Sequence, residues 1–110
     1  MTNGMRPDQI DTAGVPILDV RMRRGSSQIR GALHYDPKGM LEAEKLVLPL
    51  PHDRPIAVYG DSDSIVAAVV DKLKRSGYGG AAPLAGGIEA WRDAGLPLEE
   101  ASEEQPIVGD

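Results

Sequence analysis

A short polar loop, residues 60–64, holds the side chains of this sequence best placed to do chemistry. It stands between an apolar run at residues 56–59, which predicts a buried strand, and a segment with apolar side chains one helical turn apart, which predicts a helix from Ile65. Such a loop directs backbone N–H groups toward a ligand beside the positive end of the helix dipole, so it predicts an anion site. Asp61 and Asp63 lie in the same loop, and each like-charge contact near a surface opposes an anion by roughly 1 kcal/mol. The loop therefore combines the backbone of an anion site with charges that repel anions.

The loop hydroxyls, Ser62 and Ser64, are effective nucleophiles only if a base lies beside them. The chain has two histidines, His34 and His52, and His52 precedes the strand, which places it at the opposite edge of the sheet. Serine and aspartate are among the residues that most often cap a helix N-terminus. We therefore predict that Ser62, Asp63 and Ser64 cap the helix rather than react.

A second possibility is that the loop carboxylates do chemistry, because Asp61, Ser62 and Asp63 follow an apolar strand with only Gly60 between. This order is similar to the first motif of haloacid-dehalogenase-like phosphatases, in which the aspartates act as nucleophile and magnesium ligands. The motif is short, however, it lies in mid-chain here, and 110 residues are few for such a domain. A divalent cation held without catalysis is a milder form of the same alternative. Our prediction is that the chain holds no metal and no cofactor.

The remaining elements alternate between strands and helices, as is typical of an α/β domain. Apolar runs at residues 15–20 and, more weakly, at 79–84 predict strands, and helical spacing predicts helices at 40–46 and 88–93. Strands that are apolar throughout indicate parallel pairing in a sheet covered on both faces. Right-handed crossovers then place the 60–64 loop at the carboxyl edge of the sheet, where ligands bind in such folds.

At 110 residues the chain is long enough for one domain. We divide it into a polar N-terminal segment at 1–13, a domain at 14–100, and an acidic tail at 101–110 that is expected to be disordered. The net charge of −5 argues against nucleic acid or a membrane surface as a partner, because both need a basic patch. No apolar stretch has signal-peptide or membrane-span length, so a cytoplasmic location is expected. The chain has no cysteine, which excludes disulfides and a thiolate of its own.

Three segments, taken in order, give the chain a resemblance to a known family. Residues 84–91, Leu-Ala-Gly-Gly-Ile-Glu-Ala-Trp, resemble the C-terminal signature of rhodanese-like domains, and Trp91 there is predicted to lie in the core. In the segment that resembles the family's active-site loop and helix, aligned without gaps, the matching residues are Tyr59, Ala67, Leu73, Gly77 and Tyr78. Leu-Asp-Val-Arg at 18–21 looks like the family's strand-ending Asp-Val-Arg. The resemblance covers about residues 16–99. It implies a central, mainly parallel sheet of about five strands, flanked by helices on both faces.

The departures from the family pattern fall where its chemistry takes place. The resemblance puts the family's reactive cysteine at Gly60 and its anion-binding arginine at Ile65, which makes residues 60–65 a degenerate active-site loop. Asp19 and Arg21 are expected next to the pocket, paired for a structural reason. Sulfur transfer through a persulfide needs a thiolate, and glycine has no side chain to form one.

From these departures we expect a catalytically inactive member of a sulfurtransferase family, a pseudoenzyme. It would act as a protein-interaction or regulatory module with an unidentified protein partner. The alternative is a sulfurtransferase or phosphatase-like enzyme that uses a non-cysteine residue or an acidic metal site.

Overall fold

The computed structural model describes residues 4–22 and 25–101. Its centre is a four-stranded sheet in the order β3-β1-β4-β5, in which all neighbouring strands are parallel. The strands are β1 (Ile17–Asp19), β3 (Leu33–His34), β4 (Ile56–Tyr59) and β5 (Ala81–Pro83). Because the strands are parallel, the residues that follow β1, β4 and β5 meet at one edge of the sheet.

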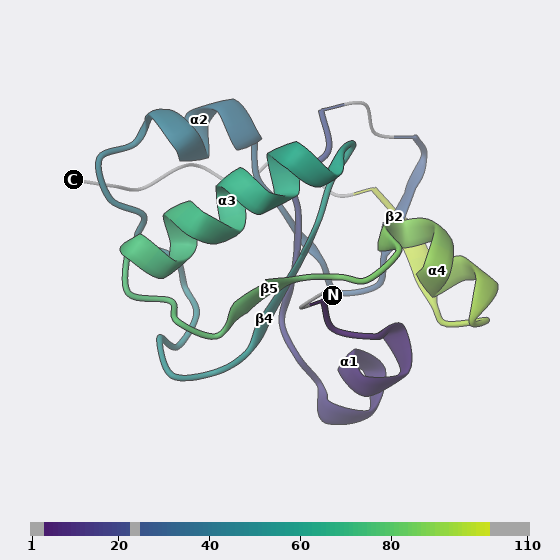
Figure 1. Cartoon of the computed structure of the whole chain (residues 1–110). Helices are drawn as coiled ribbons and strands as arrows, with labels where there is room; N and C mark the ends of the chain where they lie inside the picture. Colours follow the sequence, from purple (N-terminus) through teal and green to yellow (C-terminus); the bar gives the residue numbers. More distant parts are fainter. Residues whose placement is uncertain (1–3, 23–24, 102–110) are drawn as a thin grey trace.

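Helices cover both faces of this sheet (Figure 1). One face carries α2 (Pro37–Glu42) and α3 (Asp63–Arg75), and the opposite face carries α1 (Pro7–Ala13) and α4 (Gly87–Asp93). The expected α/β class, with a parallel sheet flanked by helices, is therefore confirmed.

Strand β4 shows how the core is divided. Ile56 and Val58 belong to the core cluster beneath α2 and α3, whereas Ala57 and Tyr59 belong to the cluster beneath α1 and α4. All four residues are buried, since both faces of the strand are covered. This is why the strand appears in the sequence as a continuous apolar run instead of an alternation.

Helix α3 forms close to where the sequence predicts it. The Ser62 hydroxyl accepts a hydrogen bond from the Ile65 N–H at 3.3 Å, so Ser62 is the N-cap. The buried side of the helix consists of Val66, Val69, Val70 and Leu73. Gly77 follows the helix with a φ of 102°, a conformation that side-chain-bearing residues rarely adopt. The capping role expected for Ser62 is confirmed.

Two short strands that the sequence analysis missed form a separate antiparallel pair. They are β2 (Ser27–Ile29) and β6 (Leu98–Glu100). Four of their six residues are polar, which leaves no apolar pattern to recognise, and the pairing joins segments far apart in the sequence. The central sheet of the described residues consequently has four strands, where about five were expected.

Helix α2 lies earlier than the helix expected at residues 40–46. It begins at Pro37, because the Asp36 carboxylate accepts a hydrogen bond from the Lys38 N–H at 3.1 Å and proline suits the first helical position. It ends at Glu42, and Ala43 continues with extended backbone. A cap-and-proline signal thus outweighs the apolar spacing on which the sequence analysis relied.

Met5 and Ile10, which precede the expected domain, pack against the rest of the chain. Ile10 of α1 is buried in the same cluster as Trp91. The Met5 N–H donates to the Pro83 carbonyl, and the Ala85 N–H donates to the Met5 carbonyl, each at 2.8 Å. The domain boundaries stay predictions, and residues 102–110 of the tail expected to be disordered lie outside the described residues. No helix within the described residues is long and apolar enough to cross a membrane.

Candidate functional site

The loop after β4 forms one wall of a pocket at the carboxyl edge of the sheet. Gly60 directly follows β4, and α3 begins at Asp63. The facing wall is the connection from β5 to α4. The pocket measures about 380 Å³ and is lined by Gly4, Tyr59, Gly60, Asp63, Val66, Ala67, Pro83, Leu84, Ala85, Gly86 and Gly87.

This lining is mostly apolar side chains and glycine. Val66 and Leu84 are buried core residues that also face the pocket. Asp63 is the one carboxylate among the lining residues, and none of them is Lys, Arg or His. The pocket lining is therefore mainly apolar and carries a single negatively charged side chain.

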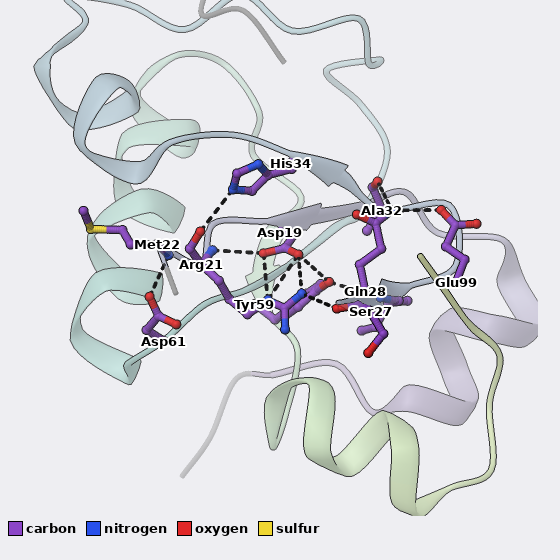
Figure 2. A network of polar contacts seen from close by, with 11 residues as sticks. Asp19, Arg21, Met22, Ser27, Gln28, Ala32, His34, Tyr59, Asp61 and Glu99 are labelled. Carbon is purple, nitrogen blue, oxygen red and sulfur yellow. Dashed lines mark hydrogen bonds and ion pairs between the residues drawn. The ribbon is translucent and has the colours of Figure 1, made fainter. Parts of the chain in front are cut away.

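Asp61 ties the loop to the segment after β1. Its Oδ2 accepts a hydrogen bond from the Met22 N–H at 2.6 Å (Figure 2). Asp61 is not part of the pocket lining, whereas Asp63 is. Within residues 4–22 and 25–101, no group of three or more His, Asp or Glu lies close enough to hold a metal ion.

The loop serines lie close to each other, and the contacts described for the two histidines are with other residues. The Ser62 and Ser64 hydroxyl oxygens are 3.3 Å apart. His34 Nε2 lies 3.0 Å from the Arg21 carbonyl, and the His52 ring stacks on Tyr78 with the ring centroids 4.2 Å apart. Neither histidine lines the pocket. Of the three residues expected to cap the helix, Ser62 is the N-cap, whereas Asp63 and Ser64 are the first two residues of α3.

Gly60 is tightly enclosed. A β-carbon at this position would lie 3.0 Å from Val20 Cγ2 and 3.1 Å from Val66 Cγ2. Its φ is not among the positive values, so the constraint is space rather than backbone conformation. Ile65, which stands at the family's arginine position, packs half-buried against the core cluster beneath α3 and does not line the pocket.

We expect Gly60→Ala to lower the free energy of unfolding by about 1–3 kcal/mol, because Val20 and Val66 must move to admit the methyl group. Urea denaturation followed by circular dichroism measures the change. Gly25→Ala is the matched control, since a β-carbon there meets nothing within 4 Å. Equal stability of the two variants would contradict the packing described around Gly60.

A buried carboxylate, that of Asp19, organises a network of hydrogen bonds that includes the pocket-lining Tyr59 (Figure 2). Asp19 accepts from Arg21 Nη2 at 2.8 Å, from the Arg21 N–H at 2.9 Å and from the Tyr59 hydroxyl at 2.9 Å. Arg21 Nη2 also donates to the Ser27 carbonyl at 2.8 Å, and the Tyr59 hydroxyl accepts from the Ile29 N–H at 3.2 Å. The network connects the ends of β1 and β4 to β2.

The protonation states in this network follow from its geometry. Burial raises the pKa of the Asp19 carboxyl, but hydrogen bonds from Arg21 and Tyr59 outweigh burial and leave the pKa below its usual value. Burial raises the pKa of the Tyr59 hydroxyl, which therefore stays protonated and donates to Asp19. Of these three residues only Tyr59 lines the pocket. Asp19 and Arg21 are linked to the pocket through Tyr59.

Lowering the pH should destabilise the folded protein through protonation of Asp19. The pKa of this carboxyl is lower in the folded chain than in the unfolded chain, so its stabilising effect is complete above about pH 5 and is lost as the pH falls below about 4. We expect the stability difference between the wild type and Asp19→Asn to narrow between pH 7 and pH 3. Urea denaturation at both pH values measures the difference, and a constant difference would contradict the assignment.

The charges of the loop lead to an expectation about anions. We expect 10 mM phosphate, sulfate or thiosulfate to raise the free energy of unfolding by less than about 1.5 kcal/mol, because Asp61 and Asp63 oppose an anion and no cation lines the pocket. Thermal denaturation measures the shift, and Asp63→Asn should bind these anions more tightly than the wild type. A larger shift in the wild type would show that the backbone amides still hold an anion.

Sequence reasoning missed two parts of this site. The wall formed by Gly4 and residues 84–87 comes from segments that were noted only for their resemblance to a family or as polar chain. The Tyr59 hydroxyl was missed as the partner of Asp19, although a polar-tipped aromatic at the end of an apolar strand is a signal for such a bond.

Fold and site together define a class: a small α/β domain with a pocket at the loop after a central parallel strand. The model of the rhodanese-like domain family matches residues 7–94. The chain belongs to this family, as the sequence resemblance indicated.

The chain is similar to proteins of known function and structure. It is 33% identical over 105 residues to the thiosulfate sulfurtransferase GlpE from Actinobacillus succinogenes, covering 91% of this chain and 89% of that protein. It is 32% identical to the rhodanese-like domain of the Alr3790 protein from Anabaena sp., with a TM-score of 0.63 over 77% of this chain and 80% of that one. It is also 28% identical to the thiosulfate sulfurtransferase from Pseudomonas aeruginosa, with a TM-score of 0.67 over 86% of this chain and 19% of that one.

These similarities correct one expectation. The prediction that the chain is not an enzyme is wrong, because a curated protein that matches it over most of both chains is a thiosulfate sulfurtransferase. The lack of cysteine excludes a persulfide on a thiol of this chain and nothing further.

Proposed function

We propose that this rhodanese-like domain acts as a protein-interaction or regulatory module in the cytoplasm, and that the pocket beside Gly60 holds a segment of its partner. The observation that carries the proposal is the pocket itself. A space of about 380 Å³ with hydrocarbon walls lies at the edge of the sheet where α/β folds bind their ligands. The proposal concerns binding and does not depend on whether the domain also catalyses a reaction.

A pocket-filling variant tests this proposal. Ala67 lies on α3 and lines the pocket, so Ala67→Trp should occupy part of the space. Lys74→Trp is the matched control, because Lys74 is exposed on the same helix and does not line the pocket. We expect a partner that is captured from lysate of the source organism by the wild type and by Lys74→Trp but not by Ala67→Trp. Capture that Ala67→Trp leaves unchanged would overturn the proposal, provided that circular dichroism shows both variants folded.

Sulfur transfer is the second candidate function. The similarity to the thiosulfate sulfurtransferase GlpE favours it. In a chain without cysteine the sulfur would have to be carried by another group. A thiosulfate:cyanide assay of the wild type beside Gly60→Cys/Ile65→Arg tests this candidate. Turnover by the purified wild type supports it, and turnover by the double variant alone rejects it.

A further inference from the structure

The pocket beside Gly60 also indicates what kind of side chain it accepts. We propose that it takes a lysine or arginine side chain from a partner protein, with the hydrocarbon stem along the apolar walls and the cation at the Asp63 carboxylate. This inference rests on the proposed docking function and adds to it the chemistry of the partner segment.

The charge of the pocket lining favours a cation. Asp63 provides the one carboxylate, and no lining residue carries a positive charge. Tyr59 is the other titratable residue of the lining, and its hydroxyl is already bonded to the Asp19 carboxylate and to the Ile29 N–H. An anionic side chain would therefore meet a like charge and no cationic side chain, whereas a cation would meet its complement.

The shape and polarity of the pocket walls favour a side chain with an apolar stem. Val66 and Ala67 on one side face Pro83 and Leu84 on the other, so the space between them is lined by hydrocarbon. Lysine and arginine are the cationic residues that bury an apolar stem while keeping the charged end near water. Asp63 is exposed, which places the negative charge where such an end would emerge.

At the start of α3, the helix dipole by itself favours anions. Asp63 stands in the first turn and offsets that dipole, and the Ser62 hydroxyl already accepts the Ile65 N–H. Asp61 adds a second negative charge to the loop while its Oδ2 accepts the Met22 N–H. With a net charge of −5, the whole chain also attracts basic partners over longer distances.

Small probes of matched size test the charge preference. The probes are n-butylammonium, 1-butanol and butyrate, titrated into the isotopically labelled chain while the amide signals of Ala67, Gly86 and Gly87 are followed by NMR. We expect n-butylammonium to bind about three- to fivefold more tightly than 1-butanol, the ratio that an exposed ion pair supplies, and butyrate to bind most weakly. Tighter binding of butyrate, or no response of these amides to any probe, would overturn the proposal.

Two variants assign the preference to one carboxylate. Asp63→Asn should reduce the affinity for n-butylammonium to that for 1-butanol, and Ser62 should still cap the helix. Glu89→Gln removes an exposed charge of α4 that does not line the pocket, and it should leave all three affinities within about twofold of the wild type. Equal effects of the two variants would show a general charge effect and contradict the proposal.

Partner capture separates this inference from the proposed function. If Ala67→Trp abolishes capture and Asp63→Asn leaves it intact, the docking function holds and the basic side chain is wrong. If Ala67→Trp leaves capture intact, the docking function itself fails. Loss of capture in both variants, together with the preference for n-butylammonium, supports both.

Discussion

Asp19→Ala is expected to lower the free energy of unfolding by about 3–5 kcal/mol, because it leaves the buried Arg21 guanidinium without its carboxylate partner. Asp19 is fully buried and Arg21 is 8% exposed, so water cannot replace the lost bonds. The Tyr59 hydroxyl loses its acceptor in the same substitution. Such a loss is a large part of the total stability of a small domain.

Urea denaturation at pH 7 measures this effect. Asp8→Ala is a suitable control, because Asp8 forms an ion pair with Arg6 at 3.7 Å and both side chains are about two-thirds exposed. The control should change stability by less than about 1 kcal/mol. If both alanine variants have the same midpoint, the network around Asp19 does not stabilise the fold.

Trp91→Ala is the second substitution with a large expected effect, about 3–5 kcal/mol of unfolding free energy. Trp91 is 2% exposed and packs between α4 and the sheet in the cluster that contains Ile17 and Leu84. Its indole Nε1–H also donates to the Pro97 carbonyl at 2.8 Å. The substitution removes both the buried ring and this bond.

Trp91→Phe separates these two losses, because it keeps an aromatic ring and removes the indole N–H. Thermal and urea denaturation should place Trp91→Phe between the wild type and Trp91→Ala. A Trp91→Ala variant as stable as the wild type would contradict the placement of α4. A Trp91→Phe variant as unstable as Trp91→Ala would assign most of the effect to the hydrogen bond.

The sequence predicts those elements whose signals are local. β4 and α3 follow from a continuous apolar run and from helical spacing; β4 forms where expected, and α3 begins at Asp63, slightly before the expected Ile65. The pair of β2 and β6 does not follow, since its six residues are mostly polar and each strand depends on a partner remote in the chain. The sequence places α2 only approximately, because its start is fixed by the Asp36 cap and Pro37 rather than by apolar residues.

The candidate site also has parts that local sequence patterns predict and parts that they do not. The position of the loop, the cap at Ser62 and the pairing of Asp19 with Arg21 follow from neighbours in the sequence. The bond from Tyr59 to Asp19 joins residues 40 apart, and it exists because the parallel register of β1 and β4 sets these two residues side by side. Tight packing around Gly60 likewise arises only when Val20 from β1's end meets the loop. Contacts between distant segments are thus the part that local patterns do not reveal.

The pairing of β2 with β6 bears on how the chain folds during synthesis. Its register sets Ser27 opposite Glu100 and Ile29 opposite Leu98, so β2 lacks its partner strand until β6 has left the ribosome. Until then its unpaired backbone groups are a template for wrong pairing with another chain. The central sheet cannot be completed early either, because β1 pairs with β4, which is synthesised later. A nascent chain arrested before Leu98 should therefore be more prone to aggregation than one released only a few residues later.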